Sequence, residues 1–235
     1  MADDVQPPKT SAKPHYHEHR NRLRARFAGD VGASMPDYEL LELVLCGAIP
    51  RRDVKPIAKA LLKRFGGFGD VISADLKALE AVDGMGFTSA VHLKAVQQAA
   101  IRLLKHEVEE GHVLSSWDAV VDYCRAAMSR DKVERFRLLF LNNRNRLIAD
   151  EVQQTGTVDH TPLYPREVVK RALELGASAL IMVHNHPSGD PTPSQADIAM
   201  THAVRDALAK IDIRLHDHII IGRRETVSLR SDGLI

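Results

Sequence analysis

Residues 184–197 read HNHPSGDPTPSQAD, and this stretch indicates both the fold and the chemistry of the chain. A continuous apolar run, Ala179 to His184, leads into it, as expected of a strand that is buried on both faces. A long helical pattern, Ser194 to Lys210, follows it. Strands that alternate with helices, here and in residues 116–221, predict a three-layer α/β domain.

The two histidines of this stretch have a spacing that suits metal binding. Residues two apart in an extended chain point the same way, so His184 and His186 can face one ion. Asp197 falls in the first turn of the next helix, where its carboxylate can turn back toward them. Three protein ligands leave a fourth position for water, whose pKa zinc lowers to about 7. The pattern therefore predicts a hydrolytic centre with one zinc ion per chain.

A metal-free interpretation accounts for part of the same stretch. Ser194 and Asp197 have the spacing of a capping box, in which both side chains only satisfy the start of a helix. This alternative explains the serine and the aspartate but leaves the paired histidines unexplained. We therefore favour the metal site.

The stretch resembles a known family motif. His184-x-His186-Pro187, followed by Ser194-x-x-Asp197, is similar to the JAMM (MPN-plus) metalloprotease motif. The string from Pro187 to Pro191 resembles the bacterial RadC branch of that family, as do the flanking segments 164–169 and 217–222. The resemblance covers about residues 20–235 and is strongest after residue 130. It implies a C-terminal JAMM-like (cytidine-deaminase-like) zinc domain.

The resemblance also implies roles for individual residues. His184, His186 and Asp197 would bind zinc, and Ser194 would stabilise the oxyanion that forms on the substrate carbonyl. Glu134, just before the strand Arg135 to Leu141, would be the general base, with Glu151 on the next strand as the rival. The implied reaction is hydrolysis of a peptide or isopeptide bond in a protein or peptide substrate by a zinc-activated water.

Residues 20–105 show short helical patterns that are broken by glycines. Within them, Leu79-x-x-Val82-x-Gly84-Met85-Gly86 resembles a helix-hairpin-helix motif. Gly84 and Gly86 would let backbone N–H groups approach a DNA phosphate, and Thr88 could donate a further hydrogen bond. Many such hairpins carry a Lys or Arg after the second glycine, whereas this chain has Phe87-Thr88-Ser89. DNA contact and a plain glycine turn between two helices both stay open.

The chain is predicted to have four segments. Residues 1–14 hold three prolines and few large apolar residues, which predicts a disordered tail. Residues 15–105 form the helical domain, and residues 106–113, polar and with a glycine, are predicted to be a linker. Residues 114–235 form the metallohydrolase domain. Within it, His216-Asp217-His218 repeats the spacing of the metal histidines without a third ligand. These residues could support the core or the residues that bind the metal, and we favour packing in the core.

Composition places the chain among ordinary globular proteins. It has 235 residues, 44% hydrophobic and 27% charged, with a net charge of +1. A charge this small does not demand a polyanionic partner. The two cysteines, Cys46 and Cys124, are far apart, which favours a reducing cytoplasm over a disulfide framework. The longest apolar runs are too short to span a bilayer, so no membrane association is expected.

Three functions compete. The leading one is a zinc metallohydrolase with a peptidase-like mechanism, since a structural domain has no need of the ligands, Ser194 and a base together. The second is a DNA-binding protein of repair or recombination whose metal domain is structural or regulatory. The third, a zinc nuclease, is disfavoured because phosphodiester cleavage often uses two metals, for which ligands are too few. The substrate, the oligomeric state and the metal present in the cell stay open.

Overall fold

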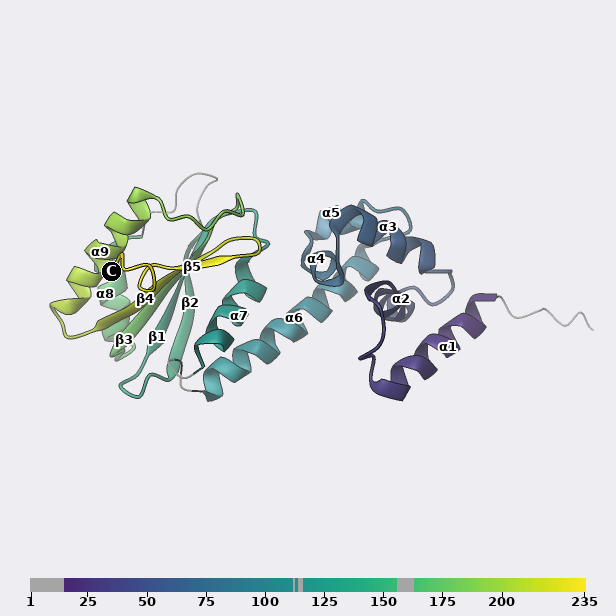
Figure 1. Ribbon diagram of the computed structural model, residues 1–235, viewed down its shortest axis with the longest axis horizontal. Helices are drawn as coiled ribbons and strands as arrows, with labels where there is room; N and C mark the ends of the chain where they lie inside the picture. Colours follow the sequence, from purple (N-terminus) through teal and green to yellow (C-terminus); the bar gives the residue numbers. More distant parts are fainter. Residues whose placement is uncertain (1–14, 112, 114–115, 156–162) are drawn as a thin grey trace, which may run out of the picture. The chain divides into compact units, whose positions relative to one another are not determined.

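The computed structural model describes residues 15–111, 113, 116–155 and 163–235 (Figure 1). The chain divides into two compact units, residues 1–97 and residues 98–235. The predicted tail, residues 1–14, lies outside the described residues. Within the described part of the chain, no helix combines the length and the apolar character that a membrane crossing requires.

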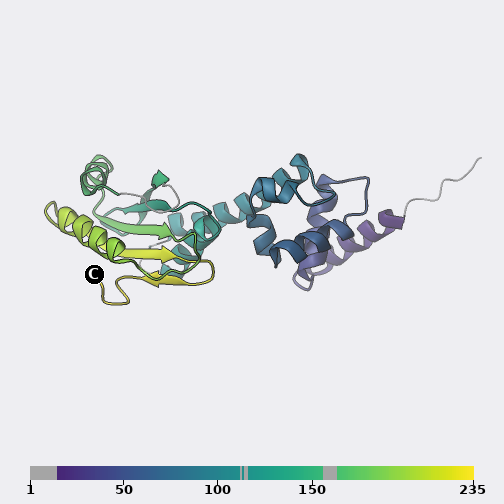
Figure 2. The same cartoon turned by 90° about the horizontal axis from the view of Figure 1, so that it is seen from above.

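The N-terminal unit is all helical (Figure 2). Its leucine-rich core includes Leu41, Leu45, Leu61, Leu79 and Leu93, all fully buried, which confirms the prediction of a helical N-terminal half. The short helix α4, which follows the turn at Gly66 and Gly67, was not predicted. The helices are α1 (His15–Asp30), α2 (Asp37–Ala48), α3 (Lys55–Phe65), α4 (Phe68–Ser73), α5 (Leu76–Glu80) and the first part of α6 (Phe87–Glu110).

Helix α6 differs from the prediction of a linker at residues 106–113. The helix continues to Glu110, and the division between the two units falls within it, between Gln97 and Gln98. The cause is an apolar residue of α6 that lies within this mostly polar stretch. Val108 is fully buried and continues the helical spacing of Ile101 and Leu104, and all three belong to one core of the C-terminal unit.

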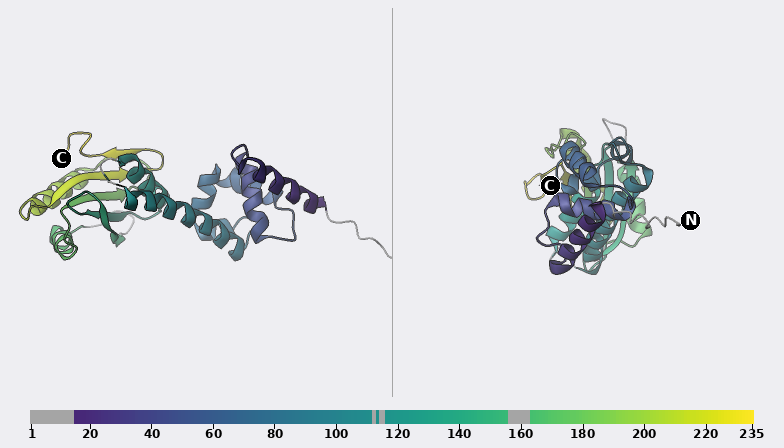
Figure 3. Two further views of the ribbon diagram at one scale, coloured as in Figure 1. Left: turned by 90° about the horizontal axis from the view of Figure 1, so that it is seen from below. Right: turned by 90° about the vertical axis from the view of Figure 1, so that its right-hand side faces the viewer.

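The C-terminal unit is built on one sheet, shown from two sides in Figure 3. Its strand order is β2-β1-β3-β4-β5. Strands β3 and β4 are parallel, whereas β1 is antiparallel to both β2 and β3, and β5 is antiparallel to β4. The strands are β1 (Arg135–Leu141), β2 (Leu147–Thr155), β3 (Ala179–Asn185), β4 (Arg214–Ile221) and β5 (Thr226–Ser228).

Helices cover both faces of this sheet (Figure 1). Helix α7 (Trp117–Met128) and the end of α6 pack on one face, against residues such as Leu139 and Ile181. Helices α8 (Pro165–Glu174) and α9 (Gln195–Ala209) pack on the other, against Phe140 and Met182. Alternate residues of β1 and β3 thus enter two separate cores, as the pleat of a strand requires. The predicted three-layer α/β arrangement is confirmed.

Candidate metal centre

The three predicted ligands meet at the carboxyl end of β3. His184 is the fully buried penultimate residue of the strand, and His186 lies one residue beyond its end. The His186 amide donates to Ile221 O at 3.0 Å, so the chain stays beside the end of β4 as it leaves the sheet. Asp197 lies in the first turn of α9. The ends of neighbouring parallel strands are where α/β proteins commonly place ligands.

The ligand atoms converge closely. His184 Nε2 lies 2.9 Å from His186 Nε2 and 3.4 Å from Asp197 Oδ1, and His186 Nε2 lies 3.6 Å from Asp197 Oδ2. Zinc–ligand distances of about 2.0–2.1 Å in a tetrahedron give ligand–ligand separations of roughly 3.3 Å. Two imidazole nitrogens and one carboxylate also match the preferences of zinc, so the residues present fit the ion.

The protonation of this group is set by burial and by mutual contact. Burial lowers the pKa of His184 to about 4, so this ring is neutral at pH 7. Contact with Asp197 raises the pKa of His186, and the charge of Glu134 acts in the same direction. Burial alone would raise the pKa of Asp197, but His186 and Ser194 hold it well below its ordinary value. The carboxylate and the two histidines therefore form a cluster that attracts a cation, whether a proton or a metal ion.

Ser194 caps α9 as the alternative interpretation expected. Its amide and its hydroxyl both donate to Asp197 Oδ2, at 2.8 and 2.6 Å, and the Asp197 amide donates back to Ser194 Oγ at 3.1 Å. The capping box and the ligand cluster thus use the same aspartate. Capping holds Asp197 Oδ2 in place, while Oδ1 lies on the side of His184.

Glu134 lies close to the ligands, immediately before β1, and its charge acts on His186. An amide side chain brackets it. The buried Asn185 donates from Nδ2 to Val133 O at 3.1 Å and accepts from the Arg135 amide at 2.9 Å. The residue between the two histidines therefore fixes the backbone on both sides of Glu134. Sequence reasoning missed this role, although the position of the asparagine between two ligands was a signal.

Glu151, the rival base, is engaged in an ion pair. Arg171 donates to it from both Nε and Nη2, at distances from 2.6 to 3.0 Å, and Gln153 Nε2 donates at 3.0 Å. These contacts, with that of Arg171 the largest, lower the pKa of Glu151. A carboxylate held in this way is less available for proton transfer.

Three further residues shape the surroundings of His184, and the sequence connected only His218 among them with the site, as the less favoured of two interpretations. Phe136 stacks on the His184 ring, with centroids 5.0 Å apart. His218 is buried in the core, as predicted, but its Nε2 also lies 2.7 Å from His184 Nδ1. Thr201 Oγ1 lies 2.6 Å from His218 Nδ1. Thr201 is four residues beyond Asp197 and so shares its helix face, which was the available signal.

The predicted DNA-contact residues lie in the N-terminal unit. Gly84 has φ +83°, and a Cβ there would come within 2.8 Å of Ile57 Cδ1, so the turn itself requires this glycine. The Gly86 amide donates to Ser89 Oγ at 2.9 Å, and a Cβ at Gly86 would meet open space. Thr88 is exposed. The glycine turn accounts for Gly84 but not for Gly86.

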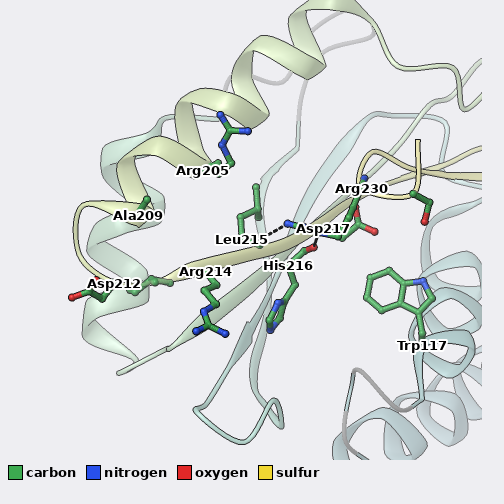
Figure 4. Close-up of a pocket in the computed structure, with 11 residues that line it drawn as sticks. Trp117, Arg205, Ala209, Asp212, Arg214, Leu215, His216, Asp217 and Arg230 are labelled. Carbon is green, nitrogen blue, oxygen red and sulfur yellow. Dashed lines mark hydrogen bonds between the residues drawn. The ribbon is translucent and has the colours of Figure 1, made fainter. Parts of the chain in front are cut away.

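A pocket lies elsewhere on the C-terminal unit (Figure 4). It has a volume of about 810 Å³ and runs along the first half of β4, between Trp117 and the end of α9. Arg230 lies along one side and donates to the backbone oxygens of Leu215 and His216. None of the predicted site residues lines this pocket.

A comparison with known protein families agrees with the geometry. A family model described as a RadC-like JAB domain matches residues 114–234. The matched segment contains all three ligands, Ser194 and both candidate bases.

Proposed function

This chain belongs to the RadC family, and from that premise we propose that its C-terminal unit is a zinc-dependent hydrolase of the JAMM type. The observation that supports the proposal best is the convergence of His184 Nε2, His186 Nε2 and the Asp197 carboxylate. Three protein ligands are typical of catalytic zinc, whereas structural zinc usually has four. The proposed substrate is a peptide or isopeptide bond in a protein, the class on which JAMM enzymes act.

The residues around the ligands supply the remaining functions. Zinc, when bound, supplies a Lewis acid that polarises the substrate carbonyl and acidifies water. Glu134 accepts a proton from the attacking water and returns it to the leaving amine. The Ser194 hydroxyl turns from Asp197 Oδ2 to the oxyanion, for which it must give up one 2.6 Å hydrogen bond. Asn185 holds Glu134 in position throughout.

The first test is the metal content of the purified protein, measured by elemental mass spectrometry. We expect one zinc per chain in the wild type and none in His186→Ala. Glu134→Gln is the matched control, because it should keep the zinc and lose hydrolysis of quenched fluorescent peptides with linear and isopeptide linkages. A well-folded wild type that binds no zinc when zinc is supplied would overturn the proposal.

Glu151→Gln separates the two candidate bases. If Glu134 is the base, Glu151→Gln should retain most of the peptidase activity, since its carboxylate serves an ion pair with Arg171. Loss of activity in Glu151→Gln, with retention in Glu134→Gln, would reverse the assignment.

The second candidate function is DNA binding by the N-terminal unit, in repair or recombination, with the metal domain structural or regulatory. One observation favours DNA contact. The exposed Arg52 has Nη2 only 3.5 Å from the Cβ position of Gly84, so it brings to the turn the positive charge that residues 87–89 lack. The buried Arg20 donates to Ile49 O, Pro50 O and Arg52 O and thereby holds the loop that carries Arg52.

Binding to a labelled DNA duplex at several salt concentrations tests this candidate. Arg52→Ala should weaken binding for all sequences and reduce the slope of log affinity against log salt by about 1. Arg166→Ala, an exposed arginine paired with Glu167 in the other unit, is the matched control. Equal binding by both variants would exclude Arg52 from the contact.

A cytoplasmic location is part of the proposal. Cys46 and Cys124 are both buried free thiols, as expected of a protein from a reducing compartment.

A further inference from the structure

A chain of hydrogen bonds runs behind His184 and ends at another ligand residue. His184 Nδ1 lies 2.7 Å from His218 Nε2, and His218 Nδ1 lies 2.6 Å from Thr201 Oγ1. Thr201 Oγ1 in turn lies 2.5 Å from the backbone oxygen of Asp197. The chain thus joins β3, β4 and α9, and the side chains of all three linking residues are fully buried.

The contact between Thr201 Oγ1 and Asp197 O fixes the donor and the acceptor of every hydrogen bond in this series. A backbone oxygen only accepts, so the single hydroxyl proton of Thr201 is donated to Asp197 O. Thr201 Oγ1 must then accept from His218, which places the proton of that ring on Nδ1. A neutral His218 consequently offers a lone pair at Nε2, and His184 must donate to it from Nδ1.

The result at His184 is a bare Nε2, turned toward the other ligands. Both rings are fully buried, and the single proton between them lies on His184 Nδ1. His186 reaches the same state by another route, because its Nδ1 lies 2.7 Å from Asp190 O, which again only accepts. Two lone pairs therefore face each other across 2.9 Å, beside a carboxylate, an arrangement that is favourable only with a cation between them.

We propose that Thr201 and His218 are positioning residues that lock His184 in the Nδ1–H tautomer and so prepare it to bind metal through Nε2. The inference deepens the proposed metal function and rests on it. The relay starts at the backbone of Asp197 and ends at His184, so it links the carboxylate ligand to an imidazole ligand through the core. Outer partners of this kind hold the orientation and the tautomer of metal-binding histidines.

The test compares Thr201→Val with Thr201→Ser in the full-length protein. Valine keeps the shape of threonine but cannot accept from His218, whereas serine keeps the hydroxyl. Without the hydroxyl, His218 is free to protonate at Nε2 and to force the proton of His184 onto its own Nε2. Zinc affinity, measured by competition with a chromophoric chelator, should fall about 10- to 100-fold in Thr201→Val and stay near wild type in Thr201→Ser.

A second measurement does not depend on zinc. Two-bond ¹H–¹⁵N correlation spectra of the metal-free wild type at pH 8 report which nitrogen of each histidine carries the proton. We expect Nδ1–H for both His184 and His218, and a change at His218 in Thr201→Val. Nε2–H on His184 in the wild type, or unchanged zinc affinity in Thr201→Val, would overturn the relay. If the wild type binds no zinc, the proposed function fails, but these spectra still decide the relay.

Discussion

Two loops of this protein lead into helices, and they differ in how completely their polar groups are paired. Before α6, the Gly86 amide donates to Ser89 Oγ, and the Ser89 hydroxyl donates back to Gly86 O. Before α9, the Ser194 amide donates to Asp197 Oδ2 and the Asp197 amide donates to Ser194 Oγ, yet two imidazole lone pairs and the charge of Asp197 still converge. Helix capping therefore explains the first loop well and only half of the second. The groups that capping does not explain, the two imidazoles and the charge of Asp197, mark the candidate functional site.

The largest effect, on zinc affinity, should come from removing the charge of Asp197. Asp197→Asn keeps the size of the side chain but removes its charge. Zinc affinity should therefore fall by more than the roughly 100-fold that is typical when a residue that only contacts a ligand is changed. Asp190→Asn is the control for a nearby charge, because the exposed Asp190 carboxylate accepts from Thr192 and acts on His186 through its charge, while its backbone oxygen faces His186 Nδ1. Chelator competition measures both, and equal affinities would mean that Asp197 is a cap alone.

The second effect is a loss of stability of the metal-free protein in mild acid. His184 binds a proton at about pH 4 when folded but near its ordinary value of 6.5 when unfolded, so stability falls as the pH drops through this window. The loss is on the order of 3 kcal/mol, and His218 adds to it. The raised pKa of His186 acts in the opposite direction, while Asp197 matters only below its ordinary value of 3.8.

Urea unfolding in the presence of EDTA measures this loss. Trp117, the single tryptophan, reports on the C-terminal unit. A free energy of unfolding that stays constant from pH 7 to pH 5 would mean that His184 and His218 are not held neutral in the folded state.

The third effect concerns the two hydrogen bonds by which Asn185 holds the backbone beside Glu134. Asn185→Ala leaves the Arg135 amide and Val133 O without their side-chain partner, which should cost roughly 2 kcal/mol of stability. Zinc should remain bound, whereas peptidase activity should fall because the base loses its position. If zinc is lost together with activity, Asn185 supports the ligands and not the base.

The smallest effect separates the two glycines of the other loop. Gly84→Ala should destabilise the N-terminal unit by about 2 kcal/mol, because of its positive φ and the contact with Ile57. Gly86→Ala meets open space and should change stability by less than about 0.5 kcal/mol. A loss of DNA binding in Gly86→Ala alone would show that this loop, too, has a function beyond capping.

The sequence predicted the elements that local pattern controls. Strand β1 begins at Arg135 and ends at Leu141, as its apolar run indicated, and the C-terminal layers follow from the alternation of strands and helices. The predicted linker at residues 106–113 missed the end of α6, because Val108 is buried by contacts with a sheet that is distant in the sequence. The three-residue strand β5 is too short to produce a pattern of its own.

In the candidate site, too, short sequence spacings were predictable and contacts between distant segments were not. His184, His186 and Asp197 were predictable because short spacings bring them together. The relay was not, because His184 and His218 are 34 residues apart. They meet only through the register of β3 and β4, which shifts between Leu180 and Ile181. An irregularity of this kind depends on the packing of the whole sheet.

Because Asn185 bonds to the backbone on both sides of Glu134, the three consecutive residues 184–186 together fix the geometry of the candidate site. His184 and His186 each contribute a nitrogen to the ligand cluster, and Asn185 between them holds the backbone on both sides of Glu134 on the neighbouring strand. In the proposed hydrolase, this tripeptide alone sets the separation between the metal and Glu134. Engineering that grafts the centre onto another sheet would have to transplant this tripeptide together with the strand start that it measures.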